Sequence, residues 1–209
     1  DPLGRLRVDR DLRLPAARHI FSAVDTACAA TDDEGNHSLM SCQHALMLGR
    51  FALGPRKMTR SKLDRTLLLW VLPLLIAPPM YSKDVYSYLA QSEITARGLD
   101  PYKIGPAAAL GIDHVFTRSV PNIWRDTPAP YGPFFIWIGE DITKITGDNI
   151  TAAIFLHRLV ALLGVVLIVW ALPRLARRCG VSGVAALWLG AMNPLVILHL
   201  VGGIHNEAL

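Results

Sequence analysis

The sequence predicts an all-α integral membrane protein: a polytopic helix bundle with a large extracytoplasmic loop bearing short amphipathic helices. Of its 209 residues, 52% are hydrophobic and 18% are charged, against about 25% charged in ordinary soluble domains. Apolar runs alternate with one long polar loop. The net charge of +4 comes from basic blocks that flank the apolar runs rather than from one patch. This pattern favours the lipid bilayer as a partner and argues against nucleic acid.

The first predicted span covers residues 66–81. It follows a basic stretch that begins at Arg50, and its 16 residues would reach roughly 24 Å at ~1.5 Å per residue. We expect Pro73 to kink this helix and the Pro78-Pro79 pair to end it.

Two further spans are predicted in the second half of the chain. Residues 150–172 form the clearest apolar run, which is followed by Pro173 and a basic cluster at 174–178. Residues 184–204 form the third, with Asn193-Pro194 as an expected kink.

The basic clusters predict how the chain is oriented in a plasma membrane. Positive residues before the first span and between the second and third belong on the cytoplasmic side. The N-terminus is then cytoplasmic, and the loop 82–149 is extracytoplasmic. Residues 1–60 show no sustained periodicity and predict a poorly ordered cytoplasmic tail, with an unnatural extension from a mis-called start as the alternative. The membrane core is then 61–209.

Because the chain starts with Asp1 and stops at Leu209 in an apolar context, we expect it to be a fragment of a longer protein. Its three cysteines have neither disulfide nor zinc spacing and are assigned structural or incidental roles: Cys28, Cys42 and Cys179.

The outer loop is patterned rather than random. Ser82 is placed to cap a helix whose apolar face holds Val85, Tyr88, Leu89 and Ala96, with Gly98 as its stop. Many prolines and glycines follow up to residue 132. A second amphipathic helix is expected to lie on the membrane surface, with an apolar stripe of Phe134, Phe135, Ile138, Ile142 and Ile145.

Asp84 is the first candidate for chemistry. It is a carboxylate at the start of a helix, immediately after a membrane span. The helix macrodipole and Lys83 both favour its ionised form. The alternative is a plain helix-start aspartate that only helps to cap the turn.

A second set of candidates lies in the proline-rich part of the loop. Arg118 and Arg125 could bind phosphate through their guanidinium forks, and Trp124 and Tyr131 could stack on a sugar ring. The alternative is a surface loop with ordinary salt bridges.

Polar residues inside the second and third spans form the last set. His157 and Arg158 lie near the outer end of the second span, where Arg158 either faces a watered cavity or snorkels to the headgroups. His199 lies near the outer end of the third span, and His205, Asn206 and Glu207 follow. His205 and Glu207 without a third ligand do not predict a metal site.

Three stretches resemble a known family: PPMYSKDVYSYLAQSEITARGLDPY, TRSVPNIWRDTPAPYGP and GGIHNEAL. They are similar to the actinobacterial alpha-(1→6)-mannopyranosyltransferases of the glycosyltransferase-C superfamily, from about residue 50 to the end. The resemblance implies a glycosyltransferase-C-like fold and a polyprenyl-phosphate-mannose donor. It also implies an extracytoplasmic acceptor, a growing alpha-(1→6)-mannan of the lipomannan or lipoarabinomannan type. Asp84 matches the family's required acidic residue, here as general base, and Lys83 matches the basic residue before it.

With this resemblance, Asp84 is the predicted catalytic residue, with no metal and no certain cofactor beyond the lipid-linked donor. The predicted substrate-binding residues are Lys83, Tyr86, Tyr88, Arg118, Trp124, Arg125, Asp126, Tyr131, Arg158, His205, Asn206 and Glu207. We expect the fragment alone to be inactive. A transporter or flippase of lipid-linked sugars and a non-catalytic membrane scaffold are the alternatives.

Overall fold

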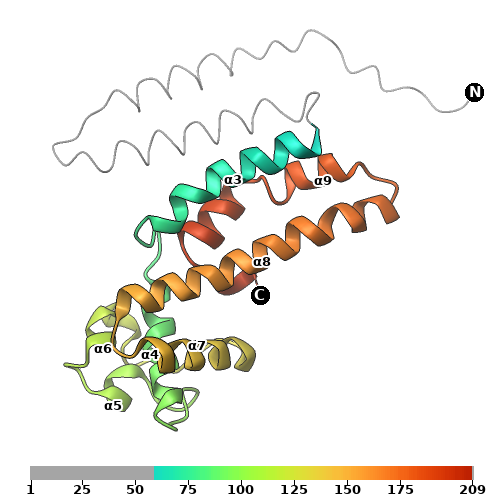
Figure 1. Ribbon diagram of the computed structural model, residues 1–209. Coiled ribbons are helices and arrows are strands. Elements are labelled where there is room, and N and C mark those ends of the chain that lie inside the picture. The colour runs from blue at the N-terminus through green and yellow to red at the C-terminus, as the bar shows by residue number, and fades with distance from the viewer. Residues whose placement is uncertain (1–58, 209) are drawn as a thin grey trace, which may run out of the picture. The chain divides into compact units, whose positions relative to one another are not determined.

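The computed structural model of the chain describes residues 59–208, which are helical and contain no strand (Figure 1). The described residues belong to the unit Met58–Leu209. The predicted tail therefore lies, except for its last two residues, outside the described part. The helices are α3 (Arg60–Ile76), α4 (Asp84–Ala96), α5 (Pro106–Leu110), α6 (Val115–Ser119), α7 (Pro133–Thr146), α8 (Ile150–Arg178), α9 (Gly183–Leu189) and α10 (Pro194–Val196), with the short turns η1 (Asn122–Trp124), η2 (Ile197–Gly202) and η3 (Asn206–Ala208).

One helix in this part of the chain, α8, is long and apolar enough to cross a membrane. The helices α9 and α10–η2 are bent by 56° at a short break and make a second candidate if they form one broken span. The predicted break at Asn193-Pro194 is confirmed, because Asn193 caps α10 and its side chain accepts from the Leu195 amide. A polytopic bundle stays a prediction.

The first predicted span differs from α3 at both ends. The helix starts earlier, at Arg60, where the Thr59 side chain accepts a hydrogen bond from the Lys62 amide. It continues through Pro73 and ends at Ile76, not at residue 81. Ala77 is extended, with ψ 149°, and the helical region is disfavoured for a residue that precedes proline. The Pro78-Pro79 pair thus ends the helix as predicted.

The helix α8 runs beyond the predicted end at residue 172, through Pro173 to Arg178. Proline removes one hydrogen bond inside a helix, but the following residues favour helix, and Arg177 and Arg178 lie in the last turn. Cations there are stabilised by the negative end of the helix dipole. The prediction that the helix stops before Pro173 was wrong.

The helices α4 to α7 gather near the N-terminal end of α8 (Figure 1). The predicted inward face of α4 is confirmed for Val85, Tyr88 and Leu89, which are buried. The helices α4 and α7 approach closely at Gly139. A Cβ added there would lie 2.0 Å from Ser92 Oγ.

The predicted apolar stripe of α7 is partly buried and partly exposed, and its place on a membrane surface stays a prediction. Phe135 and Ile142 are buried, but Phe134 is 63% and Ile145 is 77% exposed. The buried face is centred on Gly139 instead, because the small residue allows α4 to approach along that side.

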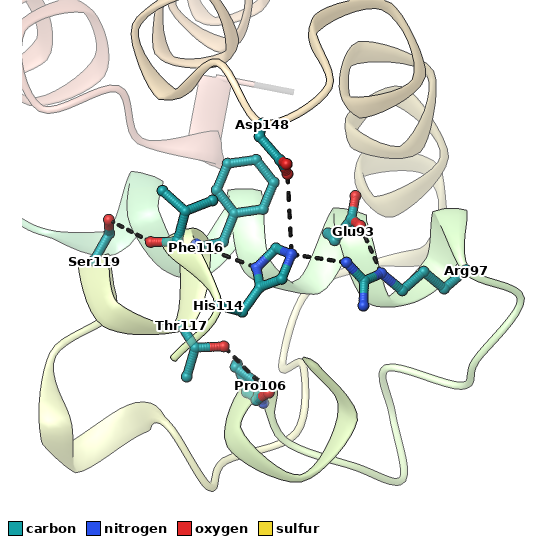
Figure 2. A network of polar contacts seen from close by, with 9 residues as sticks. Glu93, Arg97, Pro106, His114, Phe116, Thr117, Ser119 and Asp148 are labelled. Atoms are coloured by element: carbon teal, nitrogen blue, oxygen red, sulfur yellow. Dashed lines mark hydrogen bonds and ion pairs between the residues drawn. The ribbon is translucent and has the colours of Figure 1, made fainter. Parts of the chain in front are cut away.

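A polar network fixes the turns around α6 (Figure 2). The Nε2 atom of His114 lies 2.7 Å from Arg97 Nη2. The Nδ1 atom of the same ring accepts a hydrogen bond from the Phe116 amide at 3.3 Å. Arg97 also pairs with Glu93 at 2.6 Å, and Asp148 Oδ1 is 3.9 Å from His114. The network connects the end of α4 to α6 and to the turn before α8, and so holds the loop against the helix that begins with Asp84.

Candidate active site

Two strained turns bring distant parts of the chain together. Among the described residues, Tyr81 (φ 64°) and Ile204 (φ 58°) are the non-glycine residues with positive φ. This conformation is an outlier for a β-branched residue such as isoleucine and is typical of functional sites. The Met80 amide donates to the Gly202 carbonyl at 3.0 Å and so links the two turns. Each turn leads directly into a predicted site residue, Asp84 and His205.

Asp84 is the first residue of α4. Its backbone amide donates to Ser82 Oγ at 3.0 Å. The N-cap of α4 is Lys83, however, so the prediction that Ser82 caps this helix was wrong by one residue. The Asp84 side chain is 24% exposed. A carboxylate that is neither fully buried nor free in solvent can accept a proton from a bound group.

His205 lies between two carboxylates. Its Nδ1 is 3.6 Å from Asp84 Oδ2 and 3.5 Å from Glu207 Oε2. Burial lowers the pKa of His205, as does the neighbouring His199, whereas Glu207 and Asp84 act in the opposite direction. The net shift is downward, which favours a neutral imidazole near pH 7.

Two tyrosines form one wall of the site. The Tyr88 and Tyr131 rings meet edge to face at 4.8 Å, and Phe135 packs against Tyr88 at 4.9 Å. Burial, together with the negative charges of Asp84 and Glu207, raises the pKa of Tyr131 to about 12. The pKa of Tyr88 is raised by burial, by Tyr131 and by the same two carboxylates. Both phenols therefore stay protonated and can donate hydrogen bonds beside Asp84.

Arg158 is 3% exposed and lies beside the C-terminal end of α3. Its Nη1 donates to the Leu75 carbonyl at 2.8 Å. In a continuing helix this carbonyl would accept from the residue four positions on, which is Pro79 and has no N–H. Arg158 Nε and Nη2 are buried and have no hydrogen-bond partner. A buried guanidinium with two unused donors is suited to an anion.

His157, the neighbour of Arg158, is also buried. Its Nδ1 donates to the Ala153 carbonyl at 2.9 Å, which leaves Nε2 as an acceptor without a partner. A narrow void is lined by His157 and His205 together with Phe135, Val160, Ala161, Ile204 and Asn206. The polar ends of α8 and of the third predicted span therefore face one another.

Sequence reasoning did not foresee the role of His199. It lies in η2, a π-helix, and its ring stacks on that of His205 at 3.7 Å. Together with Glu207 the two histidines form a group whose possible ligand atoms lie within 4.8 Å of one another. In a regular helix positions 199 and 205 would point in different directions. The turn at Ile204 and the π-helix bring them together, and neither has a clear sequence signal.

The structure gathers some predicted residues and leaves others apart. Asp84, Tyr88, Tyr131, His205 and Glu207 are in contact or electrostatically coupled. Asn206 joins them through a backbone hydrogen bond to Tyr88. Tyr86 packs against the core beside them. Lys83 is exposed and precedes the first turn of α4.

The predicted site residues of the proline-rich loop lie apart from the group around Asp84. Arg125 donates from Nε to the Val120 carbonyl at 3.0 Å and from Nη2 to the Arg118 carbonyl at 2.9 Å. Its guanidinium therefore holds the loop backbone. Arg118 and Asp126 are exposed, as is Trp124 at 37%. No contact in the described part joins these side chains to Asp84.

Residues 26–209 match the family described as alpha-(1→6)-mannopyranosyltransferase, N-terminal domain. The chain is 71% identical over 164 residues to a probable alpha-(1→6)-mannopyranosyltransferase of Mycolicibacterium smegmatis, which is 78% of this chain and 29% of that protein. It is 74% identical over 164 residues to an alpha-(1→6)-mannopyranosyltransferase of Mycobacterium tuberculosis, covering 78% of this chain and 28% of the relative. The chain thus spans less than a third of the length of these curated relatives.

A stretch of 52 residues is also 50% identical to an NADH dehydrogenase-like protein of Mycobacterium tuberculosis, which is 25% of this chain and 13% of that protein. So small a share of that protein does not indicate its function here. No solved structure matches the chain.

Proposed function

Because the chain belongs to the alpha-(1→6)-mannopyranosyltransferase family, we propose that it forms the N-terminal part of an enzyme that transfers mannose. The donor is polyprenyl-phosphate-mannose, and the acceptor is a growing alpha-(1→6)-mannan of the lipomannan or lipoarabinomannan type. The observation that carries the proposal is the position of Asp84 between Tyr88, Tyr131 and His205. Here a partly exposed carboxylate lies beside His205 and acts electrostatically on two buried tyrosines.

Asp84 is the general base of this reaction. The acceptor hydroxyl oxygen forms a bond to C1 of mannose as its proton passes to the Asp84 carboxylate. The bond between C1 and the phosphate oxygen breaks, and its electron pair leaves with polyprenyl phosphate. Because phosphate is a good leaving group, one carboxylate suffices, and no second carboxylic acid is needed as in glycoside hydrolysis.

Arg158 is the residue we assign to the donor phosphate. Its two unpartnered, buried donors can stabilise the negative charge that develops on the leaving phosphate. Arg125 is less suited, because its guanidinium is engaged with two backbone carbonyls. Tyr86, Tyr88, Trp124 and Tyr131 stay proposed contacts of the sugar or the polyprenyl chain.

We place the protein in the plasma membrane, with Asp84 on the extracytoplasmic side. The support is the apolar surface of α3 and α8, where Leu69 is 67%, Leu163 is 56% and Trp170 is 57% exposed. Exposed apolar faces of this kind suit lipid or further membrane helices. A single cysteine at position 82, with Cys28, Cys42 and Cys179 replaced by serine, should react with an impermeant thiol reagent in intact cells. Reaction only after cell lysis would contradict this orientation.

A transporter of lipid-linked sugars is the second candidate. The bent pair α9 and α10–η2 favours it, because discontinuous helices are common in transporters.

One assay separates the two functions. A chimera in which this chain replaces the matching segment of the Mycolicibacterium smegmatis relative is reconstituted in liposomes with radiolabelled polyprenyl-phosphate-mannose and a mannan acceptor. The enzyme produces labelled mannan and free polyprenyl phosphate in a one-to-one ratio. Intact donor that moves between leaflets without being consumed would support the transporter.

A further inference from the structure

We propose that His199, His205 and Glu207 form a binding site for one divalent transition-metal ion, with Zn²⁺ as the ion that fits best. Two imidazoles and one carboxylate are a ligand set typical of zinc sites that keep a fourth position open for water or substrate. Imidazole ligands disfavour Mg²⁺ and Ca²⁺, which prefer oxygen alone.

The distances within the group suit an ion. His205 Nδ1 and Glu207 Oε2 are 3.5 Å apart. Two ligands of a tetrahedral zinc ion, each at about 2.0–2.1 Å from the metal, lie roughly 3.3 Å from one another. An ion can therefore bind between these two atoms with little movement. The possible ligand atom of His199 lies within 4.8 Å of both.

The charge of the group also calls for a cation. The ionisable groups that act on His205 are His199, Glu207 and Asp84. Within the described residues, no lysine or arginine is among them, so two carboxylates lie within 4 Å of His205 Nδ1 without a basic side chain that acts on the same group. A divalent ion would balance this charge.

The backbone conformation next to these residues also supports a binding site. The third predicted span ends in a π-helix at Ile197–Gly202, and Ile204 follows with φ 58°. Both conformations are unfavourable locally and are enriched at functional sites. Together they place His205 over His199.

The stacked rings of His199 and His205, 3.7 Å apart and inclined by 19°, must open when the ion binds. Imidazole lone pairs lie in the plane of the ring, so two parallel rings cannot direct both lone pairs to one ion. His199 is exposed and can turn. Beside Asp84, the open position of the ion would accept an anionic oxygen such as that of the donor phosphate, and this role alone rests on the proposed function.

Metal binding is tested on the purified chain in detergent micelles, without a histidine tag and with its cysteines replaced by serine. After treatment with a chelator, the chain is titrated with Co²⁺, and bound Zn²⁺ is measured by mass spectrometry after equilibrium dialysis. We expect one tight equivalent of Zn²⁺ and the visible absorption of tetrahedral Co²⁺. His199→Asn and Glu207→Gln should each weaken binding at least tenfold, at unchanged helical circular dichroism.

His114→Asn and Glu140→Gln are the matched controls, because they change the same residue types outside the group, and both should bind as the parent chain does. A parent chain that binds no ion would overturn the proposal, as would variants at 199 and 207 that bind like the controls. If the chain binds Zn²⁺ as expected but the chimera transfers no mannose, the proposed function is contradicted and the metal site stands.

Discussion

Asp84 Oδ2 and His205 Nδ1 lie 3.6 Å apart, although the two residues are 121 positions apart in the sequence. The contact depends on the hydrogen bond between the Met80 amide and the Gly202 carbonyl, which joins the turn before α4 to the end of η2. It places Asp84 beside the residues that follow η2, so that the start of α4 and the end of the described chain meet at the candidate site.

Replacing Arg158 by methionine should weaken binding of the donor. The substitution removes the buried guanidinium that we assign to the phosphate, and charged hydrogen bonds of this kind contribute about 1.5–3 kcal/mol. In the chimera we expect the KM for polyprenyl-phosphate-mannose to rise at least tenfold. Arg118→Met is the control, because that side chain is exposed. An equal rise in KM for both variants would refute the assignment.

Arg125→Lys should destabilise the proline-rich loop. The lysine cannot donate to the Val120 and Arg118 carbonyls at the same time, as the guanidinium does at 3.0 and 2.9 Å. We expect a loss of about 1–3 kcal/mol, seen as a lower melting temperature in detergent. Arg118→Lys leaves the carbonyl at 118 in place and should melt as the parent does. Unchanged melting of Arg125→Lys would show that the loop does not depend on this contact.

Gly139→Ala should loosen the packing of α4 on α7, since the new Cβ would lie 2.0 Å from Ser92 Oγ. Overpacking of this kind costs about 1–3 kcal/mol. Gly132→Ala is the matched control, because nothing lies within 4 Å of a Cβ built there. Thermal unfolding of both variants tests the contact, and adding Ser92→Ala to Gly139→Ala should restore part of the loss. Equal melting temperatures for the two glycine variants would mean that the helices are not so close.

The phenol of Tyr131 should ionise at a higher pH than a free tyrosine. Burial and the negative charges of Asp84 and Glu207 together raise its pKa to about 12. The unfolded phenol ionises near pH 10, so its contribution to stability is fully present below pH 10 and is lost as the pH rises through 12. The step of tyrosinate absorbance near pH 12 should be absent in Tyr131→Phe. In Asp84→Asn that step should move to lower pH, and a step that stays in place would separate Tyr131 from Asp84.

The helix faces could be predicted because they follow from local patterns. The spacing of Val85, Tyr88 and Leu89 gave the buried face of α4, and Asn193-Pro194 gave the break in the last span. The end of α8 was missed because Pro173 does not stop a helix whose following residues favour it.

The candidate site was only partly predictable. Asp84 follows from its place after a span and from the family's motif, but the positive φ of Ile204 and the π-helix depend on tertiary contacts. Hence the stacking of His199 on His205 could not be read from their spacing. The hydrogen bonds by which Arg125 holds the loop backbone could not be predicted either. Their acceptors are backbone carbonyls, which every sequence has.

The rate of mannosyl transfer by the Asp84→Asn chimera tests the account most directly. Asparagine keeps the size of the side chain but cannot take the proton of the acceptor hydroxyl, so we predict that kcat falls about 10²- to 10⁴-fold. Expression should be normal, and Asp113→Asn, an exposed aspartate in the same loop, should be fully active. Transfer by Asp84→Asn at a rate near that of the parent chimera would contradict the role of Asp84 as general base.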